Sequence, residues 1–128
     1  MPLISFVTLS VEDVARAADF YREWLERAPT RTGPSWAFFE VDGQTLALFE
    51  RAAMATEAGV TGAPGGVGLS WNLADRGALD AALARAVSAG ARVTRPLHGK
   101  PWGALAAWIA DLDGHPWELV YNPKRPPQ

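Results

Sequence analysis

The chain has 128 residues, no cysteine, a formal net charge of −2 and 48% hydrophobic residues. These values are typical of one soluble globular domain. They argue against disulfides, thiolate metal sites and a basic surface for nucleic acid. Residues 1–10 lack the pattern of a signal peptide, and no apolar run reaches the ~18 residues that a membrane span needs. We therefore expect a cytoplasmic protein with no membrane partner.

The first half of the chain predicts a strand, a helix and a hairpin. Residues 4–11 alternate between two faces: Val7, Leu9 and Val11 on one, Phe6, Thr8 and Ser10 on the other. Apolar residues then repeat at helical spacing from Asp13 to about Ala28, and we expect Pro29 to end this helix. Strands over 36–41 and 45–50 flank the turn Asp42-Gly43, with a short extra strand at 30–32.

The second half follows the same plan after a connector. Residues 51–59 predict a short helix, and the Gly- and Pro-rich residues 59–66 indicate a connector. A strand over 67–73 precedes a helix with Leu79, Ala82 and Val87 on its apolar face, and Gly90 suits the position after its end. Further strands are expected at 91–95, 105–110 and 117–121, the last two joined around the turn Asp113-Gly114.

The two halves repeat one another. Adding 62 takes Val7, Leu9, Val11 and Asp13 onto Leu69, Trp71, Leu73 and Asp75. Adding 71 takes the turn Asp42-Gly43 onto Asp113-Gly114. The repetition predicts a single α+β domain built from two tandem βαβββ modules. Their bounds are about 4–50 and 66–122, with a linker at about 51–65 and a tail at 123–128.

One helix per module leaves the opposite face of each sheet uncovered. Two such faces, on curved mixed sheets, can surround a concave pocket. Strand alternation puts the following residues toward that pocket: Phe6, Thr8, Ala47, Gly68, Ser70 and Glu118. A shift of one residue in the register would invert these positions.

The chain also carries six tryptophans. Three have the parity of core residues: Trp24, Trp71 and Trp117. Trp108 has the parity of a pocket residue, and Trp102 lies in the loop before the strand at 105–110. Together with Phe6 and Phe39, these two are expected to form a stacking surface for a flat ligand, the alternative being core or subunit packing.

Two stretches carry a family resemblance: FVTLSVEDVARAADFY near the start and WGALAAWIADLDGHPWELVYNP near the end. They resemble the opening and the "DPDG…WEL…NP" ending of vicinal oxygen chelate proteins. This superfamily includes glyoxalases, ring-cleaving dioxygenases, epimerases and bleomycin-resistance proteins. The resemblance covers almost the whole chain and implies the two-module fold, but the superfamily hosts several chemistries.

The resemblance also implies where a metal would bind. In metal-dependent members His, Glu or Gln ligands stand at four equivalent strand positions, which here hold Phe6, Ala47, Gly68 and Glu118. Only Glu118 can bind a metal, and a catalytic site needs about three protein ligands. We therefore expect no metal and no cofactor. The two histidines, His98 and His115, are expected to be solvated loop residues.

The leading hypothesis is a small-molecule-binding homodimer. By resemblance to bleomycin-resistance proteins, it would bind a partly aromatic molecule without metal and sequester an antibiotic or toxin. The rival is an enzyme of the lyase, isomerase or dioxygenase type. It would use Glu118 as a base, or hold a metal through ligands displaced by a register error. A Glu118 carboxylate satisfied by its neighbours, or a pocket that binds only an incidental metabolite, are the remaining alternatives.

Overall fold

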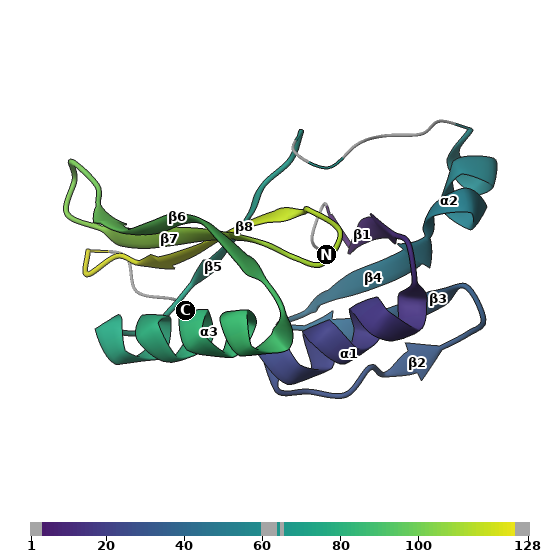
Figure 1. The fold of residues 1–128 in the computed structure, drawn as a ribbon, viewed down its shortest axis with the longest axis horizontal. Coiled ribbons are helices and arrows are strands. Elements are labelled where there is room, and N and C mark those ends of the chain that lie inside the picture. The colour runs from purple at the N-terminus through teal and green to yellow at the C-terminus, as the bar shows by residue number, and fades with distance from the viewer. Residues whose placement is uncertain (1–3, 60–63, 65, 125–128) are drawn as a thin grey trace. The chain divides into compact units, whose positions relative to one another are not determined.

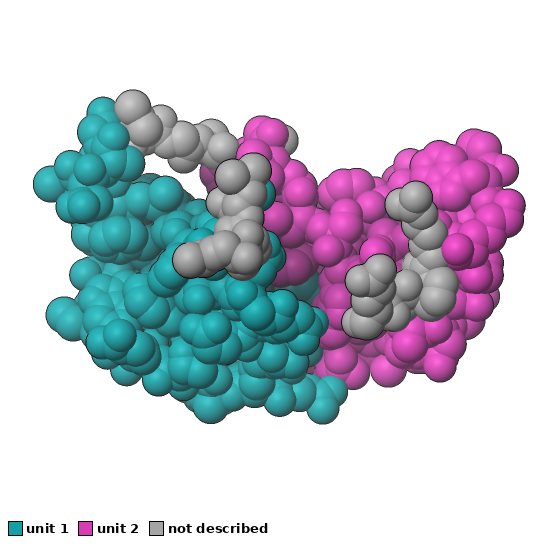
Figure 2. Space-filling model, turned by 180° about the vertical axis from the view of Figure 1, so that it is seen from behind, with its two compact units in different colours: residues 1–63 teal, residues 64–128 magenta. Residues whose placement is uncertain are grey.

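The chain divides into two compact units, residues 1–63 and residues 64–128 (Figure 2). The computed structural model describes residues 4–59, 64 and 66–124. Each unit holds one four-stranded sheet, and we describe each by itself. In the described segments, none of the helices combines the length and the apolar content that crossing a membrane would require. The pocket expected between the two modules stays a prediction.

In the first unit a helix packs on one face of a mixed sheet (Figure 1). The elements are β1 (Phe6–Val11), α1 (Val14–Leu25), β2 (Arg31–Thr32), β3 (Trp36–Val41), β4 (Gln44–Glu50) and α2 (Arg51–Ala58). The sheet order is β1-β4-β3-β2, with β1 parallel to β4 and the other neighbours antiparallel. We call the sheet face opposite the helix the open face of its unit.

The second unit repeats this arrangement. Its elements are β5 (Leu69–Asn72), α3 (Arg76–Ala89), β6 (Arg92–Gly99), β7 (Leu105–Ala110) and β8 (Pro116–Tyr121). The sheet order is β5-β8-β7-β6, again with the first strand parallel to the last, and α3 contacts β6, β7 and β8. Both units therefore have the same connectivity, which confirms the predicted α+β fold of two tandem βαβββ modules.

The repeat extends to the start of each helix. Asp13 accepts a hydrogen bond from the Arg16 backbone N–H at 3.1 Å, and Asp75 accepts one from Ala78 at 2.7 Å. Such N-caps stabilise a helix by about 1 kcal/mol each. The helix ends differ: α3 ends at Gly90 as predicted, whereas α1 ends at Glu26 in a left-handed conformation. The expectation that this helix continues to about Ala28 and is ended by Pro29 is therefore wrong.

The helix-facing side of each sheet forms the core of its unit. In the first unit Tyr21 and Trp24 of α1 are fully buried with Phe39 and Leu48 of the sheet. Fully buried residues of the second unit are Leu79, Ile109 and Leu119. Burying each such side chain contributes roughly 1.5–3 kcal/mol. Trp117 is buried, as expected of a core residue, and Trp71 is half-buried.

Strand β6 is longer than the pattern predicts. It runs from Arg92 to Gly99 rather than ending at Arg95, and its pairing with β7 shifts register twice. It lies at the edge of the sheet, so that Pro96 can sit within it although proline lacks a backbone donor. The bulges and the edge position break the alternation that would have revealed this strand.

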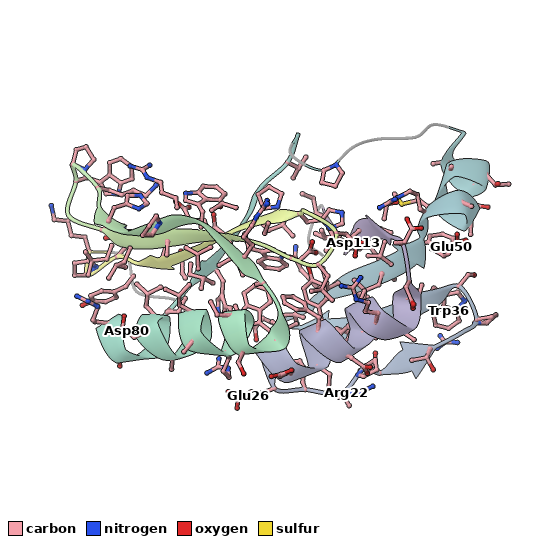
Figure 3. The ribbon with its side chains drawn as sticks, in the orientation of Figure 1. Arg22, Glu26, Trp36, Glu50, Asp80 and Asp113 are labelled. Atoms are coloured by element: carbon pink, nitrogen blue, oxygen red, sulfur yellow. The ribbon has the colours of Figure 1, made fainter. Side chains whose placement is uncertain are left out.

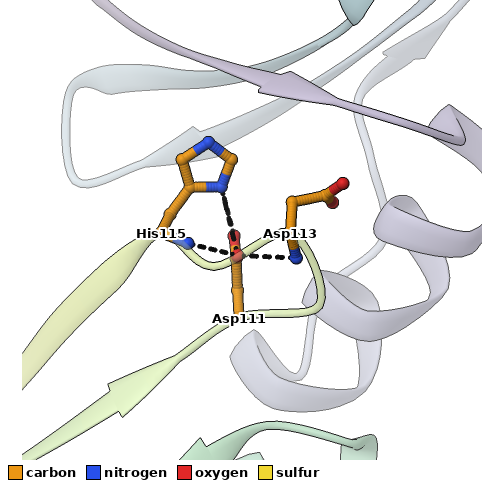
Figure 4. Close-up of polar contacts among 3 residues, drawn as sticks. All are labelled: Asp111, Asp113 and His115. Atoms are coloured by element: carbon orange, nitrogen blue, oxygen red, sulfur yellow. Dashed lines mark hydrogen bonds and ion pairs between the residues drawn. The ribbon is translucent and has the colours of Figure 1, made fainter. Parts of the chain in front are cut away.

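The turn between β7 and β8 is organised by one buried carboxylate (Figure 4). Asp111 Oδ1 accepts from the backbone N–H groups of Asp113 at 3.0 Å and His115 at 2.8 Å. The His115 ring donates from Nδ1 to Asp111 Oδ2 at 2.9 Å, and 13% of its side chain is exposed. His115 is therefore part of a buried network, and the expectation of a solvated loop histidine is wrong.

Asp111→Ala is expected to lower the free energy of unfolding by about 2–3 kcal/mol, because the turn's buried donors lose their acceptor. Asp80→Ala is the matched control, since Asp80 pairs with Arg76 on the exposed surface of α3 (Figure 3) and is expected to cost under ~0.5 kcal/mol. Urea unfolding followed by circular dichroism measures both. Equal losses in the two variants would contradict a stabilising role for the Asp111 network.

Candidate functional site

The open face of the second unit brings polar groups together from neighbouring strands. Ser70 on β5 pairs with Glu118 on β8, which pairs with Trp108 on β7. Paired residues point to the same side of a sheet, so that these three share the open face. Their sequence neighbours Ile109 and Leu119 point to the core. The three therefore lie on the face that strand alternation predicts, while their roles as ligand contacts stay predictions.

Glu118 is almost enclosed on this face. Its Oε1 accepts a hydrogen bond from the Ser70 hydroxyl at 3.0 Å, and its Oε2 lies 2.6 Å from the Lys100 ammonium. The Glu118 side chain is 12% exposed and that of Lys100 is 20% exposed. Oε2 is fully buried and accepts no well-formed hydrogen bond from the described residues, so that its charge is balanced by the ion pair with Lys100. The charge of the Glu118 carboxylate is thus balanced inside the protein. This arrangement agrees with the alternative, given in the sequence analysis, that neighbouring groups satisfy Glu118.

Lys100 comes from the far edge of the same sheet. It directly follows β6, and its backbone N–H donates to the Ala104 carbonyl at 2.7 Å, just before β7. Its side chain therefore passes β7 to reach Glu118 on β8. Sequence reasoning missed Lys100, since the contact spans 18 residues and crosses an intervening strand, which local periodicity does not reveal.

Trp108 occupies the space beside Gly68. A Cβ atom added at Gly68 would lie 3.1 and 3.3 Å from two carbon atoms of the Trp108 indole. These distances are tighter than nearly all real Cβ contacts, so that any side chain at position 68 would have to displace the ring. Gly68 is therefore matched to Trp108, and a side chain at this position would require the indole to shift by a few tenths of an ångström.

The residues present do not fit the metal that the resemblance implies. Phe6, Ala47 and Gly68 offer no donor atom, and the Glu118 carboxylate is already paired with an ammonium. Across residues 4–59, 64 and 66–124, no three His, Cys, Asp or Glu side chains converge as a metal-binding group. A divalent ion with about three protein ligands cannot be assembled from these positions.

The open face of the first unit is aromatic rather than polar. Phe38 pairs with Ala47, which pairs with Thr8, so that these three share the open face. The Phe38 ring lies 5.4 Å from that of Phe6 in an edge-on arrangement and 4.7 Å from that of Trp36. Phe6 is 51% exposed, so that part of this aromatic surface is open to solvent.

Phe39 is not part of this surface. It is fully buried on the helix side, with its ring 6.3 Å from that of Tyr21, and the expectation that it faces the open side is wrong. The missed residue is its neighbour Phe38. The two-residue turn Asp42-Gly43 pairs Val41 with Gln44 and therefore Phe39 with Leu46, a core position. Counting back from the turn would have identified Phe38 from sequence.

The sequence pattern left Trp36 unassigned. In the structure its indole packs directly against the backbone of a glycine. This glycine is Gly33, where any side chain would overlap the ring. Trp36 begins β3 (Figure 3) and pairs with Phe49, which puts it on the open face beside Phe38. The first unit therefore presents a row of Phe6, Phe38 and Trp36, which we call the aromatic row.

Two further groups flank the Lys100–Glu118 pair. Trp102 is 56% exposed, and the Lys100 ammonium lies 5.3 Å from the centre of its ring. His98 is on β6 and not in a solvated loop, so that expectation is wrong. Its Nδ1 donates to the Pro96 carbonyl at 2.9 Å, and its Nε2 is buried with no partner among the described residues.

Gly68→Ala is expected to shift the Trp108 indole and to lower stability by roughly 1 kcal/mol, because the added methyl overpacks the ring. The indole N–H resonance of Trp108 in a ¹⁵N-labelled sample reports the shift. Gly66→Ala is the control, since its Cβ would meet open space. An unchanged Trp108 resonance in Gly68→Ala would show that position 68 has room for a side chain.

Comparison with known proteins identifies the family. A profile of the Glyoxalase/Bleomycin resistance protein/Dioxygenase superfamily matches residues 3–119. A comparison with curated protein sequences gave no match. Among solved structures, a glyoxalase-related enzyme from Fulvimarina pelagi has 30% sequence identity and a TM-score of 0.90. The structural match covers 96% of this chain and 90% of the Fulvimarina pelagi enzyme.

Two more solved structures show the range of relatives. A glyoxalase/bleomycin resistance protein/dioxygenase from Nocardioides is 25% identical with a TM-score of 0.78, covering 100% of this chain and 89% of its own. A lactoylglutathione lyase from Agrobacterium tumefaciens is 23% identical with a TM-score of 0.77, covering 95% and 96%. The likeness to the lyase is one of fold alone.

Proposed function

Because the chain belongs to the glyoxalase/bleomycin resistance protein/dioxygenase superfamily, we propose that it binds a small, partly aromatic molecule without a metal ion. The Lys100–Glu118 ion pair carries this proposal. A divalent ion would have to displace the ammonium, and the three equivalent strand positions would supply no other ligand. The pair instead supports a polar anchor made entirely of protein groups.

The aromatic row supports the second half of the proposal. The Phe38 ring lies within stacking distance of both Phe6 and Trp36, and Phe6 is half exposed. An aromatic pair contributes roughly 0.5–1.5 kcal/mol beyond the area that it buries. A flat ligand ring placed on such side chains would gain this energy, which a purely aliphatic molecule would not.

Sequestration of an antibiotic or a toxin is the use that we propose for such binding. The superfamily takes part of its name from bleomycin resistance, and a sequestering protein needs a binding surface without turnover. The proposal includes a homodimer in the cytoplasm, since a cysteine-free chain suits a reducing compartment. Light scattering on purified protein would give the number of subunits.

Freshly purified protein is expected to contain no stoichiometric divalent metal by elemental analysis. A panel of flat antibiotics and aromatic metabolites is expected to include compounds that quench tryptophan fluorescence and raise the melting temperature. At a concentration 100 times Kd, a ligand stabilises the folded state by about 2.7 kcal/mol. A stoichiometric metal would overturn the metal-free proposal. A panel without any response would remove the support for aromatic binding.

An enzyme remains the second candidate, favoured by the way Ser70 orients the Glu118 carboxylate at 3.0 Å. In that case Glu118 would be the base acting on a carbonyl compound. The relative from Agrobacterium tumefaciens is named a lactoylglutathione lyase, so that lactoylglutathione is the first substrate to test. Glu118→Gln is then expected to lower turnover by about 10²-fold or more while binding persists. Turnover that survives the substitution would contradict a catalytic Glu118, and Asp80→Ala serves as the control.

A further inference from the structure

The Glu118 carboxylate is closed to a ligand by its own neighbours. Ser70 occupies one oxygen at 3.0 Å, and the Lys100 ammonium covers the other at 2.6 Å. The covered oxygen is fully buried. A ligand could reach this buried oxygen only after displacing Lys100, which would leave a charge in a partly desolvated site.

Lys100 is the accessible end of this pair, and its position is fixed by the backbone. The Gly103 N–H donates to the Lys100 carbonyl at 2.9 Å, and the Lys100 N–H donates to the Ala104 carbonyl at 2.7 Å. Gly103 has a φ of +102°, which favours glycine in this tight turn. The exposed ring of Trp102, also in the turn, lies 5.3 Å from the ammonium nitrogen. The turn therefore presents a cation that lies over an exposed flat ring.

The ammonium has three hydrogens to donate, and its ion pair with Glu118 leaves hydrogens available for a ligand. A ligand oxygen bound to one of these would lie close to Glu118 Oε2, which is only 2.6 Å from the same nitrogen. If that oxygen were anionic, repulsion from the Glu118 charge would offset much of its attraction to the ammonium, and the ligand would also lose its own hydration. An uncharged carbonyl oxygen accepts the same hydrogen bond without this repulsion.

We infer that Lys100 is the group that binds the ligand, and that the ligand presents an uncharged carbonyl oxygen beside a flat ring that stacks on Trp102. Glu118 is then a positioning residue that aims the ammonium, and it makes no contact with the ligand. This inference rests on the proposed function and names the chemical class of its ligand. It assigns selection against carboxylates to Glu118, a role that simple ion pairing for stability would not require.

Three naphthalene compounds with the same ring system test the inference. 2-Acetylnaphthalene carries a neutral carbonyl, 2-naphthoate carries a carboxylate, and 2-ethylnaphthalene carries neither. The wild-type protein is expected to bind the acetyl compound about tenfold more tightly than the ethyl compound, since a hydrogen bond to a charged donor is gained. Naphthoate is expected to bind no more tightly than the ethyl compound. Quenching of tryptophan fluorescence gives each Kd.

Variants identify the groups responsible. Lys100→Met is expected to abolish the preference for acetyl over ethyl. Lys124→Met removes the other lysine of the chain and is expected to keep it. Glu118→Gln removes the neighbouring charge and is expected to raise the affinity for naphthoate by about tenfold. The double variant Lys100→Met/Glu118→Gln leaves no unpaired charge, which guards against misfolding of the single variant, and is also expected to show no preference.

The outcomes separate the two proposals. If both Lys100 variants keep the preference for the acetyl compound, or if the wild-type protein prefers naphthoate, the inference is wrong while metal-free aromatic binding stands. If Glu118→Gln leaves the affinity for naphthoate unchanged, the selective role of Glu118 is wrong. If none of the three compounds binds the wild-type protein, the proposed function is contradicted and the inference with it.

Discussion

A four-stranded sheet with a single helix can bury only one of its faces. In each unit, alternate residues of the strands are committed to the helix side, where Phe39 and Leu48, or Ile109 and Leu119, are fully buried. The remaining residues point to the open face. The charged and polar groups of the second unit lie there, since they would be costly among the core side chains. This division of faces positions the aromatic row in one unit and the Lys100–Glu118 pair in the other.

The ion pair is a poor device for stability. Removing two charges from water costs several kcal/mol per ion, and well-packed apolar residues of similar size often stabilise a protein as well or better. Here Ser70 satisfies the second carboxylate oxygen, and Trp102 lies beside the ammonium, so that the pair is well supported. Because ion pairing is a weak source of stability, we propose that this closely held pair serves recognition of a ligand.

The two modules share the same backbone arrangement, but equivalent positions on their open faces hold different side chains. Thr8 beside Ala47 in the first unit corresponds to Ser70 beside Glu118 in the second, at the same places in equivalent sheets. The first pair is uncharged and lies beside Phe38, whereas the second meets an ammonium and lies beside Trp108. Phe6 likewise corresponds to Gly68, whose space the Trp108 ring takes. Duplication thus supplied two frames with different side chains on their open faces.

The sequence by itself determined the duplication, the order of the strands and helices, and the open-face positions of Ser70, Trp108 and Glu118. These follow from alternation, helical spacing and turn residues, which act over a few neighbouring positions. Even the Phe39 error was one of local counting, since the Asp42-Gly43 turn sets the pairing of both flanking strands.

Only the tertiary structure decided which side chain pairs with Glu118. Its partner Lys100 follows an edge strand with two register shifts, and the side chain reaches across an intervening strand. His115 was likewise placed by the fold around Asp111 rather than left in solvent. The Lys100 contact depends on how strands are brought together in space, and neither periodicity nor composition carries that information. The Asp111–His115 contact joins residues four apart and depends on the shape of the turn between β7 and β8.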